Sequence, residues 1–247
     1  MMLESDLFPL HRPELREALK RGDARLSAAM RPHARPVPAG TVLIRQDEPH
    51  GHVYRAETGW LARSRQLSDG VRRLVMIFLP NDLFAVKCMF LAHQPDEVVA
   101  LTDVTLSSID QQAAHELAAG DPDIALRLAF QLGEEERRLH GWTLALARPA
   151  VERLGYMLLE LRARLDLAGV VAGNRFRLPM TQEQIGDRTG LSLIHVNRVL
   201  RILRERGLVT ISRGMVEIHD LAGLRELVLP QLDIFEREHP AFGARPR

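Results

Sequence analysis

The sequence predicts an α+β fold in three parts: an N-terminal β-roll (a double-stranded β-helix), one long helix, and a C-terminal winged helix-turn-helix. Three observations predict it. Short alternating or β-branched runs separated by turn residues fill positions 35–110. A helical period follows Pro122, and two short helices that meet at a glycine follow Thr181. The expected boundaries are 1–122 for the roll, 123–148 for the long helix and 149–247 for the C-terminal domain with its tail.

Composition is that of a globular protein, because 46% of the 247 residues are hydrophobic and 26% are charged. The formal net charge of +1 neither favours nor excludes a nucleic-acid partner. Cys88 is the only cysteine, so an intrachain disulfide is excluded. The chain shows no secretory signal and no apolar stretch long enough to span a bilayer. We therefore expect a cytoplasmic protein with no membrane partner.

Residues 1–30 are expected to be helical and polar, followed by the strands of the roll. Ser68-Asp69-Gly70, between two strand-like runs, is the best hairpin signal. Many short strands at this spacing indicate a sandwich or roll. The predicted strands are 41–44, 53–56, 60–65, 71–79, 98–101 and 104–109.

A helix of about 25 residues is predicted from Pro122, which lies in the first turn, where its missing N–H costs little. Arg148-Pro149 ends it, because proline removes a donor and clashes with the preceding turn. So long an amphipathic helix needs a partner surface, so we expect it to pair in a homodimer; packing on the chain's own β-domain is the alternative. Its heptad-like stripe comprises Ile124, Leu128, Gln131/Leu132, Glu135, Leu139, Trp142 and Leu146.

Residues 181–206, TQEQIGDRTGLSLIHVNRVLRILRER, predict a helix-turn-helix, whose second helix enters the DNA major groove. A capping box begins the first helix at Thr181, and Ser192 caps the second. Gly186 lies where the helices approach closely, and Gly190 lies where the chain turns with positive φ. These agreeing positions favour DNA binding over a helical hairpin that only packs.

A further helix at 151–167 precedes this motif. Strands at 208–211 and 215–219 follow it about an Arg213-Gly214 turn and form a wing. Asp220 is expected to cap a last helix at 221–229, and 231–247 is expected to be a weakly ordered tail.

Charge is concentrated in the same region. Eight arginines and three carboxylates lie between Arg175 and Arg213, a local balance of +5 that is typical of a phosphate-binding surface. A solvated helix face is the alternative, which the helix-turn-helix context disfavours. One stripe of the second helix, with Val196 and Val199, is assigned to the core and the opposite face to DNA. The candidate DNA-binding residues are Thr181, Gln182, Ser192, Leu193, Ile194, His195, Asn197, Arg198, Arg201 and Arg213.

With these three parts in this order, the chain from about residue 25 to 228 resembles the Crp/Fnr family of bacterial transcription regulators. The most specific parts are GTVLIRQDE at 40–48, residues 80–84 and the helix-turn-helix. The resemblance implies a cyclic-nucleotide-binding-like sensor roll and a homodimer whose paired recognition helices read double-stranded DNA at a two-fold symmetric operator. It also implies that a signal passes through the dimer helix, and contact with RNA polymerase if the protein is an activator.

The resemblance assigns roles on the recognition helix. Arg198 aligns with the family's guanine-reading arginine, while Ile194 stands where several members have a glutamate that accepts from cytosine. Because Ile194 offers only apolar contact, a different half-site is expected. Asn197 is assigned to adenine or to a phosphate. The better phosphate candidates are Ser192, His195, Arg201 and Arg213.

The family's cyclic-nucleotide contacts are replaced in this chain. Ala85-Val86 stands for a Gly-Glu pair, Pro95-Asp96 for an Arg-Ser pair, and the purine-contacting Thr-Ser pair falls near Leu139-His140. Asp96 and Glu97 would repel a cyclic phosphate, which needs a cation and donors. The effector is therefore unknown and not expected to be a cyclic nucleotide; a true cyclic-nucleotide receptor with altered contacts is the alternative. Another small molecule, redox or gas sensing, and control by expression level stay open.

Other chemistry finds little support. Iron–sulfur members of the family use several N-terminal cysteines, which this chain lacks, and haem held by a histidine such as His50 or His52 is disfavoured against ordinary surface roles. Cys88 is expected to be a core thiol, since a redox role needs exposure and a lowered pKa. We find no metal triad, nucleophile elbow or phosphate-cradling glycine loop, which disfavours the hypothesis of a β-barrel enzyme. No cofactor and no metal are predicted.

Overall fold

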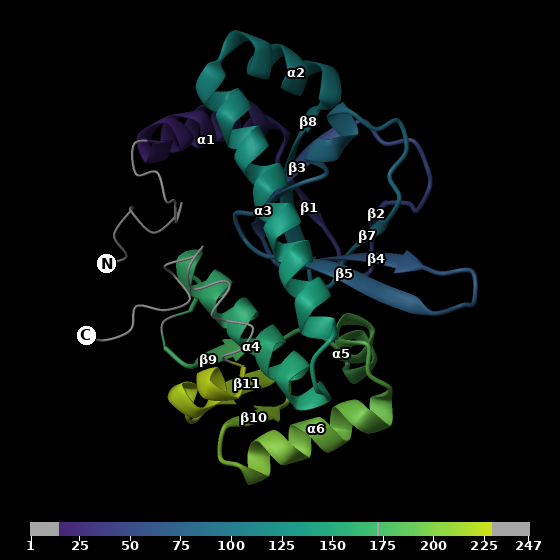
Figure 1. Ribbon diagram of the computed structural model, residues 1–247. Coiled ribbons are helices and arrows are strands. Elements are labelled where there is room, and N and C mark those ends of the chain that lie inside the picture. Colours follow the sequence, from purple (N-terminus) through teal and green to yellow (C-terminus); the bar gives the residue numbers. More distant parts are fainter. Residues whose placement is uncertain (1–14, 172, 229–247) are drawn as a thin grey trace. The chain divides into compact units, whose positions relative to one another are not determined.

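The structure, a computed structural model, describes residues 15–171 and 173–228 (Figure 1). The described chain packs as two compact units, one that ends at Leu139 and one that begins at His140. Among these residues no helix is long and apolar enough to cross a membrane. The expected tail at 231–247 and the beginning of the expected N-terminal helix lie outside the described residues.

Two four-stranded antiparallel sheets form the first unit, a β-roll. The six predicted strands are confirmed to within two residues, and β1 and β6 are additional. Both additions are too short to show alternation, and β1 contains a proline. One sheet has the order β1-β8-β3-β6, which are Arg35–Val37, Val104–Asp110, His52–Thr58 and Leu83–Phe84. The other has the order β2-β7-β4-β5, which are Val42–Ile44, Glu97–Ala100, Leu61–Gln66 and Arg72–Phe78.

An apolar core fills the space between these sheets. Phe78 of β5 and Phe84 of β6 stack in it with ring centroids 4.7 Å apart. The predicted hairpin turn, Ser68-Asp69-Gly70, joins β4 and β5. Its Asp69 carboxylate accepts a backbone N–H at 2.9 Å, and Gly70 has a φ of +83°, so the turn residues have the conformation their types favour.

Helices pack against the outside of the roll (Figure 1). Leu26 of α1, Val53 of β3 and Ile124 of α3 share a second apolar cluster. Helix α2, which the sequence analysis does not predict, follows β8 directly, and Asp110 at the end of that strand caps it. The helices of this unit are α1, η3, η4, α2 and α3, which span Arg16–Met30, Arg31–His33, Val86–Met89, Gln111–Gly120 and Pro122–Leu146.

The heptad-like stripe of α3 packs on its own chain. Ile124 and Leu128 belong to the second apolar cluster, and Leu139 packs against the core of the roll. Glu135 is buried and lies 2.8 Å from Arg63 of β4. Much of this stripe therefore packs within the chain, which is the alternative stated for it, while Leu146 near its end is 48% exposed. The opposite face of α3 carries Leu126, Ala129, Phe130 and Gly133, which are half-buried or exposed.

The second unit holds the helix-turn-helix. β9, which the sequence analysis does not predict, pairs antiparallel with β11 and makes a three-stranded sheet of order β10-β11-β9. Residues 221–228 are helical, and Asp220 accepts from the Gly223 N–H at 2.8 Å, as expected of the cap. The predicted helices and wing strands are confirmed: α4, α5, α6, β10 and β11 span Ala150–Leu167, Gln182–Thr189, Leu193–Glu205, Val209–Ser212 and Met215–Ile218. The additional strand β9 spans Arg175–Arg177.

Candidate nucleic-acid interface

Side-chain caps and two glycines fix the turn between α5 and α6. Thr181 Oγ1 accepts from the Gln184 N–H at 3.1 Å, and Gln184 Oε1 accepts from the Thr181 N–H at 2.9 Å. Gly190 ends α5 with a φ of +68°. A Cβ on Gly186 would lie 2.5 Å from the Leu191 carbonyl oxygen, so the helices approach more closely there than a larger residue allows. The predicted capping box and both glycine roles are confirmed.

Helix α6 has one buried and one exposed face. Val196 and Val199 are buried in the unit, as predicted. Ile194 is 80% exposed and Leu193 45% exposed, beside three exposed polar side chains. The exposed face therefore combines apolar and cationic groups, which suits a groove edge that offers methyl groups as well as acceptors. The polar side chains are Asn197, Arg198 and Arg201.

The first turn of α6 contains local hydrogen bonds. Ser192 Oγ accepts from the His195 N–H at 3.4 Å and lies 2.8 Å from His195 Nδ1. This arrangement confirms the predicted cap. Asn197 Nδ2 donates to the Leu193 carbonyl at 3.1 Å. The second Nδ2 hydrogen and Oδ1 of Asn197 stay available for a base or a phosphate.

The arginines on this surface differ in availability. Arg201 lies 3.8 Å from the exposed Glu205, whereas Arg198 makes no ion pair with any described residue. Arg213 is exposed at the tip of the wing, where it and Gly214 have φ values of +50° and +74°. Two consecutive positive φ values are the type I′ geometry of a tight hairpin, so the wing aims Arg213 outward. Thr181 and Gln182, at the start of α5, are exposed as well.

One of the eight arginines counted in this region is buried. The Arg188 guanidinium stacks 3.7 Å from the ring centroid of Trp142 and lies 3.6 Å from Glu160 Oε2. Trp142 Nε1 donates to the same carboxylate oxygen at 2.6 Å. Burial lowers the pKa of Arg188 to about 10, and Glu160 partly offsets that effect. The expected surface charge is therefore too high, because Arg188 holds α3, α4 and α5 together inside the unit.

The candidate effector residues lie mostly at the entrance to η4 and the strand that follows. Ala85 adopts φ +60° just before η4, and Val86 is buried. The Pro95 carbonyl accepts a hydrogen bond from Arg65. Leu139 packs on the core of the roll, whereas His140 is exposed and belongs to the second unit. The structure thus places Ala85, Val86, Asp96 and Leu139 in the roll unit, while His140 follows Leu139 on α3 and is exposed.

Asp96 is part of a buried charge cluster. Its carboxylate lies 3.2 Å from Arg63 and 3.7 Å from Lys87, and Arg63 in turn lies 2.8 Å from Glu135. Burial and Arg63 lower the pKa of Lys87, while Asp96 and Glu135 raise it. The expected repulsion of an anionic ligand by Asp96 is therefore offset by the cations Arg63 and Lys87. An anionic ligand is disfavoured for another reason, because Arg63 already has two carboxylate partners. Nothing in the strand sequence, LARSRQ, marks Arg63 as a buried cation, so sequence reasoning missed this cluster.

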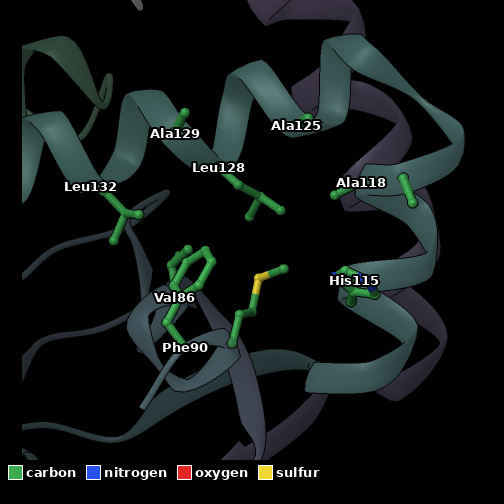
Figure 2. Close-up of a pocket in the computed structure, with 10 residues that line it drawn as sticks. Val86, Phe90, His115, Ala118, Ala125, Leu128, Ala129 and Leu132 are labelled. Carbon is green, nitrogen blue, oxygen red and sulfur yellow. The ribbon is translucent and has the colours of Figure 1, made fainter.

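An apolar hollow of about 330 Å³ lies between η4, α2 and α3 (Figure 2). His115 at its edge is the one polar side chain in its lining. Phe90 next to it is 73% exposed. The other residues around the hollow are Val86, Met89, Ala118, Ala119, Ala125, Leu128, Ala129 and Leu132.

Cys88 is buried, and the described histidines His50 and His52 lie close together. Burial, with Asp110 nearby, raises the pKa of the Cys88 thiol to about 11, which keeps it protonated at neutral pH. His50 Nε2 lies 3.2 Å from the His52 carbonyl, and the two rings are 6.0 Å apart. In residues 15–171 and 173–228, no group of three or more His, Cys, Asp or Glu side chains is placed to hold a metal ion.

Each of the two units matches a known protein-family domain. Residues 34–121 match the cyclic nucleotide-binding domain and residues 152–227 the Crp-like helix-turn-helix domain. The transcriptional activator protein FnrA of Stutzerimonas stutzeri is 28% identical over 200 residues, which are 81% of this chain and 82% of that protein. The nitrogen fixation regulation protein FixK of Rhizobium meliloti is 29% identical over 190 residues, 76% of this chain and 83% of that protein. The structure of FixK2 from Bradyrhizobium japonicum matches with a TM-score of 0.72 at 26% identity, over 78% of this chain and 96% of that one.

A helix-turn-helix joined to a roll of the cyclic-nucleotide-binding type defines a class, the DNA-binding transcription regulators, and the relatives are regulators rather than enzymes. Both matches and the shared α+β fold agree with the resemblance seen in the sequence. The chain belongs to the Crp/Fnr family of transcription regulators.

Proposed function

We propose that the chain is a homodimeric, sequence-specific transcription regulator that binds a two-fold symmetric operator in the cytoplasm without a cyclic nucleotide. The exposed face of α6, with Arg198 and Ile194, is the observation that carries the proposal, and the exposed Arg213 of the wing supports it. One relative is named a transcriptional activator, which supports activation through RNA polymerase. In this proposal residues 1–122 form the sensor roll, 123–148 the dimer helix and 149–247 the DNA-binding domain.

Base recognition is assigned to two side chains. Arg198 makes no ion pair with a described residue, so its planar guanidinium is available to pair with O6 and N7 of a guanine. Ile194 contacts a thymine methyl, since it has no polar atom. The phosphate contacts, which set position and not sequence, are assigned to Thr181, Gln182, Ser192, His195, Arg201 and Arg213.

Dimerisation is assigned to the outward face of α3. Ala129 and Gly133 are one turn apart, both are exposed, and no atom lies within 4 Å of a Cβ built on Gly133. Small residues at this spacing let a second helix approach closely, and Leu126 and Phe130 supply apolar area beside them. A two-fold pair of α3 helices would present two α6 helices to half-sites one helical turn apart.

Independence from cyclic nucleotides is supported by the buried cluster in the roll. A cyclic phosphate needs a cation, and Arg63 already lies within 3.2 Å of two carboxylates. The hypothesis of a true receptor with altered contacts would require this cluster to open. Micromolar binding of cAMP or cGMP in calorimetry would favour that second hypothesis.

The test is selection of DNA from a random-duplex library by the purified protein, with sedimentation to give its oligomeric state. The expected result is a dimer that enriches a palindromic site. Arg198→Ala should then cost about 1–3 kcal/mol on the selected site and relax the preference at one base pair. Arg213→Ala is the matched control, since it should weaken selected and random DNA alike and lower the salt slope by about one unit. A monomer that enriches no sequence would refute the proposal.

A further inference from the structure

We infer that Glu135 is a built-in anion: it binds Arg63 where an anionic effector would need that cation, and it fastens α3 to the roll without a ligand. This inference rests on the proposed function, because it concerns how DNA binding by this chain is regulated. It assigns Arg63 and Glu135 as positioning residues for DNA binding, a role that the family comparison does not supply.

The cluster joins four separate elements of the first unit. Arg63 comes from β4, Lys87 from η4, Asp96 from the position just before β7 and Glu135 from α3. Arg63 Nη1 donates to Glu135 Oε2 at 2.8 Å, and Arg63 Nε lies 3.2 Å from Asp96 Oδ2. The side chains of Arg63 and Glu135 are 7% and 8% exposed. Two cations therefore face two carboxylates in a site nearly closed to water.

The two carboxylates differ in what they connect. Asp96 lies on the roll itself and also approaches Lys87, at 3.7 Å, so it neutralises cations within the roll. Glu135 lies on α3 and is the carboxylate by which Arg63 reaches the helix. An external anion at Arg63 would compete with these two carboxylates, and a displaced Glu135 would leave a buried charge without its partner.

The consequence reaches DNA binding through α3 itself. This helix runs unbroken from Pro122 to Leu146, and its residues from His140 onward belong to the unit that carries the helix-turn-helix. Trp142 in its last turns donates to Glu160 of α4. The contact between Arg63 and Glu135 is therefore made by the same helix that continues into the DNA-binding unit.

Glu135 is held by only one of its oxygens, which makes replacement by a free carboxylate testable. Its Oε1 is buried and has no hydrogen-bond partner among the described residues. Truncation to alanine removes the carboxylate and leaves a space of its own size beside Arg63. A small anion such as formate can enter that space, which would turn the variant into an anion-dependent DNA binder.

The experiment measures, by fluorescence anisotropy, the affinity of full-length protein for the duplex that the unaltered protein selects. Formate replaces chloride at constant ionic strength. We expect Glu135→Ala to bind at least about tenfold more weakly in chloride and to regain most of that loss in about 0.1 M formate. Glu135→Gln, which fills the space without charge, should be as weak and show no rescue. Glu136→Ala, an exposed neighbour, should match the unaltered protein in both salts.

Three outcomes would overturn the inference. One is normal DNA affinity of Glu135→Ala in chloride, and another is a loss that formate does not restore, since a merely structural role predicts that. The third is a formate response of equal size in the unaltered protein. Circular dichroism melting of each variant establishes that folded protein is compared. If the unaltered protein selects no duplex at all, the proposed function fails instead, so the two failures are distinguishable.

Discussion

Replacing Gly186 by alanine should loosen the helix-turn-helix without removing any side chain. The new Cβ would lie 2.5 Å from the Leu191 carbonyl oxygen, which is a backbone atom and cannot rotate away. Gly186 and the start of α6 must therefore separate by about 0.5–1 Å to restore an ordinary contact. Overpacking of this kind costs about 1–3 kcal/mol, and alanine regains up to about 1 kcal/mol of helix propensity. Because the contact is with backbone, we expect a net loss of about 1–2 kcal/mol.

Urea unfolding followed by tryptophan fluorescence measures this loss, since Trp142 lies in the same unit as Gly186. Gly120→Ala is the control in the other unit, where Trp60 reports: no atom lies within 4 Å of its built Cβ, so it should leave stability unchanged or raise it slightly. DNA affinity should fall in Gly186→Ala alone, because the turn sets how α6 is held. A Gly186→Ala protein as stable as its parent would refute the reasoning, because the contact of the new Cβ with the Leu191 carbonyl would then cost no free energy of unfolding.

Three other predictions concern the roll and α3. Burial alone would raise the pKa of Asp23, but Arg55 and Arg127 outweigh that effect and hold the pKa below its usual 3.8. The contribution of Asp23 to the stability of the fold is therefore present above pH 3.8 and is lost as the pH falls through the lowered value. Urea melts at pH 3 and 7 should differ less in Asp23→Asn than in the parent. Cys88, with a pKa near 11 and a buried thiol, should react with a maleimide at neutral pH only after unfolding, and fast labelling of native protein would contradict that. Gly133→Arg should sediment as a monomer if the outward face of α3 pairs subunits.

Local chemistry made much of this fold predictable. The strands of the roll, the bounds of α3 and both caps of the helix-turn-helix follow from period, proline position and turn residues, which act over a few positions. The short strands β1, β6 and β9 escaped, because two or three residues carry no period. Helix α2 escaped because its start is a single aspartate at the end of a strand.

Long-range partners explain the remaining errors. A helical period says which residues of α3 share a face, but not whether that face meets another subunit or the chain's own roll. Arg188 looked like one more surface cation until the structure placed it against Trp142 and Glu160, far from it in sequence. The same holds for Arg63 and Glu135, which are 72 positions apart. Pairs of this kind are decided by the packing of whole elements.

The exposed Ile194 has a consequence for how recognition depends on the medium. Contacts between arginines and phosphates weaken as added salt competes for the duplex, and this affects all sequences alike. An apolar contact with a thymine methyl is not screened by ions. Added salt should therefore weaken the affinity of this regulator more than its selectivity. Discrimination at the base proposed to contact Ile194 should persist at salt concentrations where overall binding has become weak.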